Sequence, residues 1–276
     1  MLKKVAAIND LSGIGKCSLT VAIPILSALK VQCCPFPTAI LSSQTGFSEY
    51  TFLDLTEEMK KYSRTWKNLN LEINTIYSGF LGSIDQIDIV SNFIKENPES
   101  FVIVDPVLGD DGVLYPIFNE KTCSKMKDLV IHSNLITPNI TEACLLLNKE
   151  FQKDFSEEEI ISIAKDLSNL GPEKVIITGI IRNEKIYNLS YDKKTNKSFT
   201  YGLKYNKCSY SGTGDIFVSI VCGLITNNYD LDFAVKTASD FIYKCVSYTS
   251  KYEKDRNQGV MFEMFLNDLT SIDKKI

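Results

Sequence analysis

A short segment late in the chain, SGTGDIF at residues 211–217, has the residue types needed to hold an anion beside a base. An apolar stretch with the character of a buried helix follows it, so its N–H groups fall at a helix N-terminus. The first turn of a helix has unpaired N–H groups and the positive end of the helix dipole. Gly212 and Gly214 allow close approach to the backbone, and Asp215 lies in the first turn. The segment predicts either an anion site beside a base or a glycine turn in which Thr213 or Asp215 caps the helix.

Other acidic and amide residues directly follow predicted strands. Asp105 follows FVIV, and Asn139 and Glu142 lie in TPNITE, at the start of a predicted helix. Phosphoryl transfer needs a base for the attacking hydroxyl, donors for the developing charge and a divalent cation on the phosphates. Asp215 suits the base and the Gly212–Gly214 amides suit the donors. Asp105, Asn139 and Glu142 suit Mg²⁺. The spacing of Asn139 and Glu142 also fits a capping box, and both interpretations can hold at once.

The elements that must position these residues alternate between strands and helices. Strands are predicted at KKVAAI, INTIYSGF, FVIVDPV, NLITPN and EKVIITG. Helices are predicted at KCSLTVAIPILSALK, LTEEMKKYSRTWKNL, SIDQIDIVSNFIKEN with Ser83 as its N-cap, ITEACLLLN and SEEEIISIAKDLSNLG. KIYNLSY and SFTYGLKY predict an antiparallel pair around the loop DKKTNK. This alternation predicts an α/β protein with a mostly parallel sheet and helices on both faces. Ligands bind beyond the carboxyl ends of such strands. No linker or repeat divides the chain, so residues 1–276 are expected to form one domain.

A glycine-rich turn near the N-terminus, GIGKCS at 13–18, comes close to two nucleotide-binding motifs. A P-loop would need glycine at the position of Asp10 and serine or threonine at Cys17. A dinucleotide fingerprint would need glycine at Ser18. Because both motifs fail, we interpret the segment as a strand-to-helix turn that could pack closely over a ligand.

Composition excludes several classes of protein. The net charge of −4 and the pI near 5.3 argue against a nucleic-acid partner. No apolar run is long enough to cross a membrane and the N-terminus is a poor signal peptide, so we expect a cytoplasmic protein. The eight cysteines show no zinc-site spacing and are expected to be buried, reduced thiols. With His132 as the single histidine, a Ser-His-Asp hydrolase is disfavoured.

Five segments together resemble the ribokinase-like superfamily, and within it the pyridoxal/pyridoxine/pyridoxamine kinases. They are GTGDIF, DPVLGDDG, TPNITEA, IYSGFLGS and AILSSQTGF, and the similarity runs from about residue 5 to about 227. The resemblance implies a three-layer fold with a small β-flap. It also implies ATP-dependent phosphorylation of the 5′-hydroxymethyl group of a vitamin B6 vitamer, a need for Mg²⁺ and for a monovalent cation such as K⁺, and a homodimer.

The resemblance also assigns roles by position. It implies Asp215 as the base and the amides of Gly212, Thr213 and Gly214 as the anion hole. The nucleotide is expected to contact Asp105, Asn139, Glu142, Thr178 and Thr213, with Asp105 and Glu142 nearest the metal. The acceptor is expected to contact Asn9, Asp10, Ser12, Gln44, Thr45 and Phe80, with Phe80 stacking on its ring.

Three positions depart from the family pattern and leave the acceptor open. Gln44 stands where relatives commonly have histidine, Phe80 replaces a common tyrosine, and Asn9 stands where close relatives often have histidine. The segment DLSGIGKCSL also resembles hydroxymethylpyrimidine kinases, which form the main alternative. A non-catalytic binding protein on the same fold is disfavoured by the intact Asp215 and its glycines. A dinucleotide oxidoreductase is disfavoured by the failed fingerprint.

Overall fold

A nine-stranded sheet forms the middle layer of the computed structural model, which describes residues 2–273. Its order is β11-β10-β9-β8-β5-β4-β1-β2-β3, and the six strands from β9 to β2 in that order run parallel. The strands are β1 (Lys4–Ser12), β2 (Gln32–Leu41), β3 (Phe52–Asp54), β4 (Thr75–Ser78), β5 (Phe101–Val104), β8 (Leu135–Ile136), β9 (Lys174–Arg182), β10 (Lys185–Asp192) and β11 (Lys197–Lys204).

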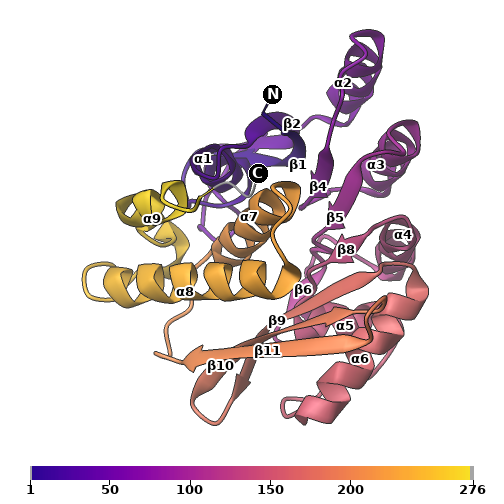
Figure 1. Cartoon of the computed structure of the whole chain (residues 1–276). Helices are drawn as coiled ribbons and strands as arrows, with labels where there is room; N and C mark the ends of the chain where they lie inside the picture. Colours follow the sequence, from indigo (N-terminus) through magenta and orange to yellow (C-terminus); the bar gives the residue numbers. More distant parts are fainter. Residues whose placement is uncertain (1, 274–276) are drawn as a thin grey trace.

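Helices cover both faces of this sheet, which confirms the predicted three-layer α/β arrangement (Figure 1). One face carries α1 (Ser18–Ala28), α7 (Thr213–Thr226), α8 (Leu231–Thr249) and α9 (Leu266–Thr270). The other carries α2 (Thr56–Asn68), α3 (Ile84–Glu96), α4 (Glu120–Ile131), α5 (Ile140–Leu147) and α6 (Glu157–Leu170). None of the helices within residues 2–273 is long and apolar enough to span a membrane.

The inner strand β1, which pairs with β4 and β2, shows why both faces of the sheet must be covered. Val5 and Ala7 pack into the core under α1 and α7, whereas Ala6 and Ile8 pack into the core on the other side. Successive side chains of a strand point to opposite faces, so an uninterrupted apolar run is buried on both. Because β1 is held on both faces, the buried polar residues near its carboxyl end, Asn9 and Asp10, have fixed positions.

Antiparallel pairs lie at the edges of the main sheet and in a second, small sheet. The predicted pairing of β10 with β11 is confirmed, although both strands extend the main sheet. A separate two-stranded sheet joins β6 (Gly109–Asp110) to β7 (Val113–Leu114), and it is a small antiparallel sheet like the β-flap that the resemblance implied.

One helix has no counterpart in the sequence-based prediction. α4 begins after Asn119, whose side chain accepts hydrogen bonds from Lys121 and Thr122 in a capping box. The same signal at Ser83, which accepts from the N–H of Gln86, did predict the start of α3. In α4 the segment EKTCSKMKD is mostly charged and polar, so the sequence pattern did not reveal the apolar face that buries Met126 and Leu129.

Candidate active site

The polar residues singled out in the sequence converge at the carboxyl edge of the parallel strands. β1 continues through α1 to β2 on one side, while its neighbour β4 continues through α3 to β5 on the other. Ligands bind in α/β sheets where two neighbouring strands diverge in this way. Asn9 and Asp10 lie near the end of β1, and Phe80 lies just beyond β4. The fold therefore predicts a ligand site between these two strand ends.

The SGTGD segment forms the N-terminus of α7, as predicted. Gly212 is the N-cap with a φ of 79°, and no side chain caps the helix, so the capping interpretation of Thr213 and Asp215 is wrong. The Thr213 hydroxyl instead donates to the carbonyl of Tyr210 at 3.0 Å. A Cβ at Gly212 would overlap the Lys16 carbonyl, whereas a Cβ at Gly214 would have no atom within 4 Å. Gly212 is thus required by the fold, while Gly214 faces open space beside the free amides of the first turn.

Asp215 is held in place by two groups from neighbouring segments. Its carboxylate accepts a hydrogen bond from the side-chain amide of Asn9 at 3.3 Å and another from the N–H of Ser18. The residue keeps some exposed surface, but the protein around its carboxyl group displaces water and raises the pKa of Asp215 to about 6. Repulsion from Asp10 adds to the rise, and the two hydrogen bonds oppose it. Such a carboxyl group is a stronger base than an ordinary aspartate.

Asn9 connects this carboxylate to the loop after β4. Its side-chain oxygen accepts from the N–H of Phe80 at 2.9 Å and from the N–H of Asp10 at 3.0 Å. With the oxygen occupied by two donors, the amide nitrogen must point toward Asp215. Gly79 is required here because a Cβ would overlap the Asn9 side chain. Asn9 is fully buried and lies against Asp215.

Asp10 and Ser12, both expected at the acceptor, bind within the protein. Asp10 is buried and accepts from the hydroxyl of Ser12 at 2.7 Å and from that of Ser18 at 2.5 Å. Burial raises the pKa of Asp10, and the hydroxyl groups lower it. Ser18 was missed in the sequence because it was considered only as the residue that replaces a glycine of the dinucleotide fingerprint. Its φ of 53° is a strained value for a non-glycine residue, and strain of this kind is concentrated at functional sites.

The acids expected near Mg²⁺ lie in the same region. Asp105 is buried and accepts from the Thr137 hydroxyl at 2.9 Å. Burial first, and then the charge of Asp215, raise the pKa of Asp105 to about 7. Burial also raises the pKa of Glu142 well above its usual range, and the charge of Asp105 adds to this. A charge on Asp215 thus disfavours a charge on Asp105, and a charge on Asp105 disfavours one on Glu142.

Asn139 and Glu142 form the capping box that their spacing predicted. The Asn139 side chain accepts from the N–H of Glu142 at 2.9 Å, and Glu142 accepts from the N–H of Asn139 at 2.9 Å. The other oxygen of Glu142 accepts from the N–H of Leu108 at 3.1 Å. Thr178 lies alongside, in a parallel bridge with Asn139. Both Glu142 oxygens are therefore occupied. In residues 2–273, no group of three or more histidine, cysteine, aspartate or glutamate residues forms a metal site.

The remaining residues expected at the acceptor, Gln44, Thr45 and Phe80, lie on loops after β2 and β4. Phe80 is partly buried and its ring centre lies 6.1 Å from that of Phe118. Gln44 donates toward Ser211 at 3.4 Å and toward the side-chain oxygen of Asn257 at 3.3 Å. Thr45, next to it, is exposed. Asn257 was missed because it lies in a polar segment, KYEKDRNQG, that reads as a solvated turn.

The glycine-rich turn packs on protein rather than forming a nucleotide motif. A Cβ at Gly13 would lie 2.7 Å from the Ser42 carbonyl, and one at Gly15 would overlap the Gln44 side chain. These glycines let the turn after β1 approach the Ser42–Gln44 segment. The strand-to-helix turn predicted at GIGKCS is thus present between β1 and α1, and it packs on protein.

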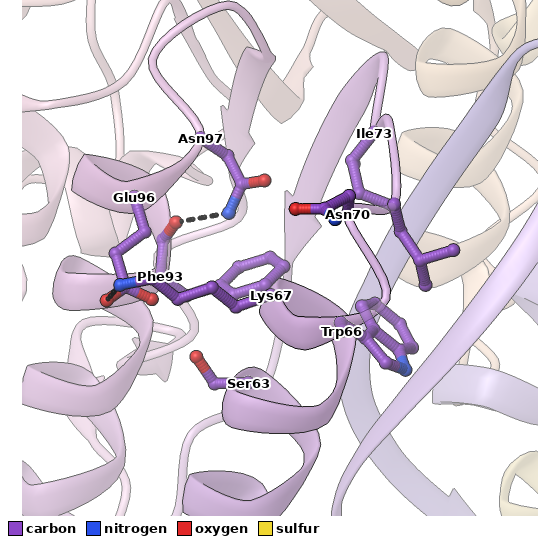
Figure 2. A pocket seen from close by; sticks show the side chains of 9 residues that line it. Ser63, Trp66, Lys67, Asn70, Ile73, Phe93, Glu96 and Asn97 are labelled. Carbon is purple, nitrogen blue, oxygen red and sulfur yellow. Dashed lines mark hydrogen bonds and ion pairs between the residues drawn. The ribbon is translucent and has the colours of Figure 1, made fainter.

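Two hollows in the surface lie outside the convergent residues. One, of about 180 Å³, lies between α2 and α3, and Figure 2 shows Trp66, Phe93 and Asn97 among its lining side chains. Ile73 places it at the opposite, amino edge of β4, so it is not the site described here. The second, of about 260 Å³, lies between the Gly13–Lys16 turn and the Gln258–Glu263 segment, beside the site.

All eight cysteines are free, and four of them are buried: Cys17, Cys144, Cys222 and Cys245.

Known proteins agree with this arrangement. The phosphomethylpyrimidine kinase family model matches residues 23–260. A protein of Bacteroides thetaiotaomicron, provisionally assigned as a phosphomethylpyrimidine kinase and crystallised with pyridoxal, is 39% identical, with a TM-score of 0.95 and coverage of 100% of this chain and 98% of its own. A pyridoxal kinase from Lactobacillus plantarum is 26% identical, with a TM-score of 0.90 and coverage of 98% and 97%.

The chain is also similar to a hydroxymethylpyrimidine/phosphomethylpyrimidine kinase of Aquifex aeolicus. It is 27% identical over 186 residues, which is 66% of this chain and 70% of the relative. The similarities thus identify a kinase of the pyridoxal kinase or hydroxymethylpyrimidine kinase type, for which ATP and a small alcohol are the implied substrates. The chain belongs to the phosphomethylpyrimidine kinase family, as a pyridoxal kinase-like protein of the ribokinase superfamily.

Proposed function

We propose that this protein transfers the γ-phosphoryl group of ATP to the 5′-hydroxymethyl group of a vitamin B6 vitamer. The observation that carries the proposal is the position of Asp215. It lies at the open N-terminus of α7, with Asn9 connecting it to the Phe80 loop. The similarity to a protein crystallised with pyridoxal supports a pyridine ring as the acceptor.

Each step of the transfer has a group to perform it. Asp215 takes the proton of the vitamer hydroxyl, whose oxygen then bonds to the γ-phosphorus while the bond to the bridging oxygen of ADP breaks. The Gly212–Gly214 amides face the charge that develops on the phosphoryl oxygens. Gly214 leaves room for that group to approach. Phe80 would stack on the ring, and Thr45 would contact its polar groups.

Mg²⁺ and K⁺ belong to the proposal, and the residues present fit Mg²⁺ unequally. Asp105 uses one carboxylate oxygen for Thr137 and has the other for a cation or its water shell. Glu142 fits a direct ligand poorly because backbone N–H groups bind both its oxygens. Its charge would act on the site through space. When bound, Mg²⁺ would neutralise the phosphate charge.

The hydroxymethylpyrimidine kinase alternative is kept because of the similarity to the Aquifex aeolicus enzyme. The deciding experiment measures ATP consumption with pyridoxal, pyridoxine, pyridoxamine and hydroxymethylpyrimidine, and identifies each product by mass spectrometry. We expect the highest kcat/KM with a B6 vitamer. A higher kcat/KM with hydroxymethylpyrimidine would reverse the assignment.

The same assay tests the base. Asp215→Ala should lower kcat by roughly 10²- to 10⁴-fold, the usual contribution of a general base, while the fold is retained by circular dichroism. A folded Asp215→Ala variant with near wild-type turnover would show that another group takes the proton.

A further inference from the structure

A turn near the C-terminus, residues 255–259, packs against two loops of the site. The N–H of Ser211, which opens the SGTGD segment, donates to the carbonyl of Arg256 at 3.0 Å. Gly259 has a φ of 70°, and a Cβ there would lie 2.8 Å from the Gly15 carbonyl. The turn therefore contacts both the SGTGD segment, called here the phosphoryl-transfer loop (residues 211–215), and the glycine-rich turn after β1. These two segments lie about 45 and 240 residues before it in the sequence.

Asn257 is the residue of this turn that faces inward. Its side chain is half-buried, whereas Asp255, Arg256 and Gln258 are exposed. The side-chain N–H₂ of Asn257 donates to the Gly46 carbonyl at 2.9 Å, and its side-chain oxygen accepts from Gln44 at 3.3 Å. Both polar atoms of the Asn257 side-chain amide thus bind the loop Gln44–Gly46, called here the acceptor-side loop.

Gln44 extends the connection to the phosphoryl-transfer loop. Its amide nitrogen lies 3.4 Å from the Ser211 hydroxyl and 3.4 Å from the Asn257 carbonyl, and its oxygen accepts from the N–H of Gly46 at 2.7 Å. The segment Thr45–Tyr50 is otherwise largely exposed. An exposed loop has little packing of its own to fix it, so its position depends largely on polar contacts. The N–H of Gln44 donates to the Ile14 carbonyl at 2.8 Å, and the side chains of Gln44 and Asn257 add the contacts that reach Ser211 and residues 255–259.

We propose that Asn257 is a positioning residue that holds the acceptor-side loop, Gln44–Gly46, against the phosphoryl-transfer loop and thereby determines which ring-bearing alcohol is accepted. The inference rests on the proposed function, because it assigns the loop at Gln44–Gly46 to the acceptor. The ligand class is a pyridine or pyrimidine ring with a hydroxymethyl group. Asn257 has no contact with the ligand in this role and acts through Gln44 and Gly46.

The test compares Asn257→Ala with a matched control, Gln258→Ala, which removes the neighbouring amide. The Gln258 side chain is exposed and has no hydrogen-bond partner among residues 2–273. Loss of two hydrogen bonds of ordinary strength should raise the acceptor KM about 5- to 10-fold in Asn257→Ala. The KM for ATP should stay within about twofold. Asn257→Asp, which can still accept from Gln44 but cannot donate to Gly46, should fall between the two.

A measurement without substrate separates this inference from the proposed function. In Asn257→Ala, amide hydrogen exchange should become faster in peptides covering residues 42–50 and 206–212, and Gln258→Ala should leave it unchanged. Gln44→Ala combined with Asn257→Ala should cost less acceptor kcat/KM than the two single effects added, because both remove the same contact.

Several results would overturn the inference. Asn257→Ala could behave like Gln258→Ala, or it could raise the KM of ATP and of the acceptor alike. Faster exchange with an unchanged acceptor KM would leave Asn257 a structural contact only. A wild-type protein that phosphorylates none of the four alcohols would overturn the proposed function and the specificity role with it. The exchange measurement would still show whether Asn257 joins the two loops.

Discussion

At the scale of single residues, the carboxylate of Asp215 lies where water is largely excluded, and hydrogen bonds hold it in place. Burial and the charge of Asp10 raise the pKa of Asp215, the hydrogen bonds that Ser18 and Asn9 donate lower it, and the net result is a pKa of about 6. A base must be deprotonated to act, yet it takes a proton more readily when its pKa is high. The balance of these four influences sets the working pH of the enzyme.

That balance predicts the acid limb of the pH profile. We expect kcat/KM to fall about tenfold per pH unit below roughly pH 6, where Asp215 becomes protonated, and to level off above it. Asp10→Asn should move the limb to lower pH because it removes a repelling charge. Initial rates between pH 4.5 and 8 measure this. A limb near pH 4 in the wild-type protein would mean that a carboxyl group with an ordinary pKa is the base.

Asn9 gives a second prediction at this scale. Asn9→Asp keeps the oxygen that accepts from Phe80 but loses the donor to Asp215 and places a second carboxylate beside it. The like charges favour protonation of the base. We expect kcat to fall about 10- to 100-fold with the acceptor KM within about threefold.

Thr38→Val is the control for Asn9→Asp, because the Thr38 hydroxyl donates to the Phe80 carbonyl on the same loop. Thr38→Val should leave the acid limb of the pH profile unmoved. A raised acceptor KM with an unchanged kcat in Asn9→Asp would return Asn9 to the ring-binding role that the sequence suggested.

At the scale of elements, the two glycines at the start of α7 have different roles, because Gly212 is required by the backbone and Gly214 leaves open space. Gly212→Ala places a side chain at a φ of 79° and against the Lys16 carbonyl, so we expect a loss of about 1–3 kcal/mol from backbone strain alone and a lower Tm. Gly214→Ala should retain or slightly raise the Tm, since alanine favours helix and the space is open. Its Cβ enters the path of the phosphoryl group, so kcat/KM should fall about 10- to 100-fold.

Thermal unfolding and steady-state rates of both glycine variants decide this. A Gly214→Ala protein with full activity would show that the phosphoryl group approaches from another direction. A Gly212→Ala protein with unchanged Tm would show that the Lys16 segment moves aside at no cost.

The sequence could predict most of the elements, with α4 as the exception, and where the strand ends meet, because apolar periodicity and the parallel order determine both. It placed Asp215, Asp105 and Glu142 at one edge, and they lie there. It could not show that Asn9 and Asp10 would be occupied by protein groups, since that depends on where Ser18 and Asp215 arrive in space. Asn257 was hidden for the same reason, because its partners lie 211 and 213 residues away.

At the scale of the whole molecule, the topology gathers acids at one edge of the sheet, where folding removes them from water. Burial raises the pKa of Asp215 to about 6, that of Asp105 to about 7, and that of Glu142 well above its usual range. A carboxyl group whose pKa is higher in the folded than in the unfolded state stabilises the fold below its unfolded pKa, near pH 4. That contribution is lost as the pH rises through the folded pKa, here between about pH 6 and 7.

The ligand-free protein should therefore become less stable from pH 5 to pH 8, by an amount on the order of a few kcal/mol. Urea unfolding at each pH measures it. Asp215→Asn should raise the free energy of unfolding at pH 8 and have little effect at pH 5, because it removes a charge that exists only at the higher pH. Glu99→Gln, which removes a charge from an exposed carboxylate, should leave the slope unchanged. Stability that rises from pH 5 to 8 would mean that the clustered acids bear their charges without penalty, and the proposed base would then have an ordinary pKa.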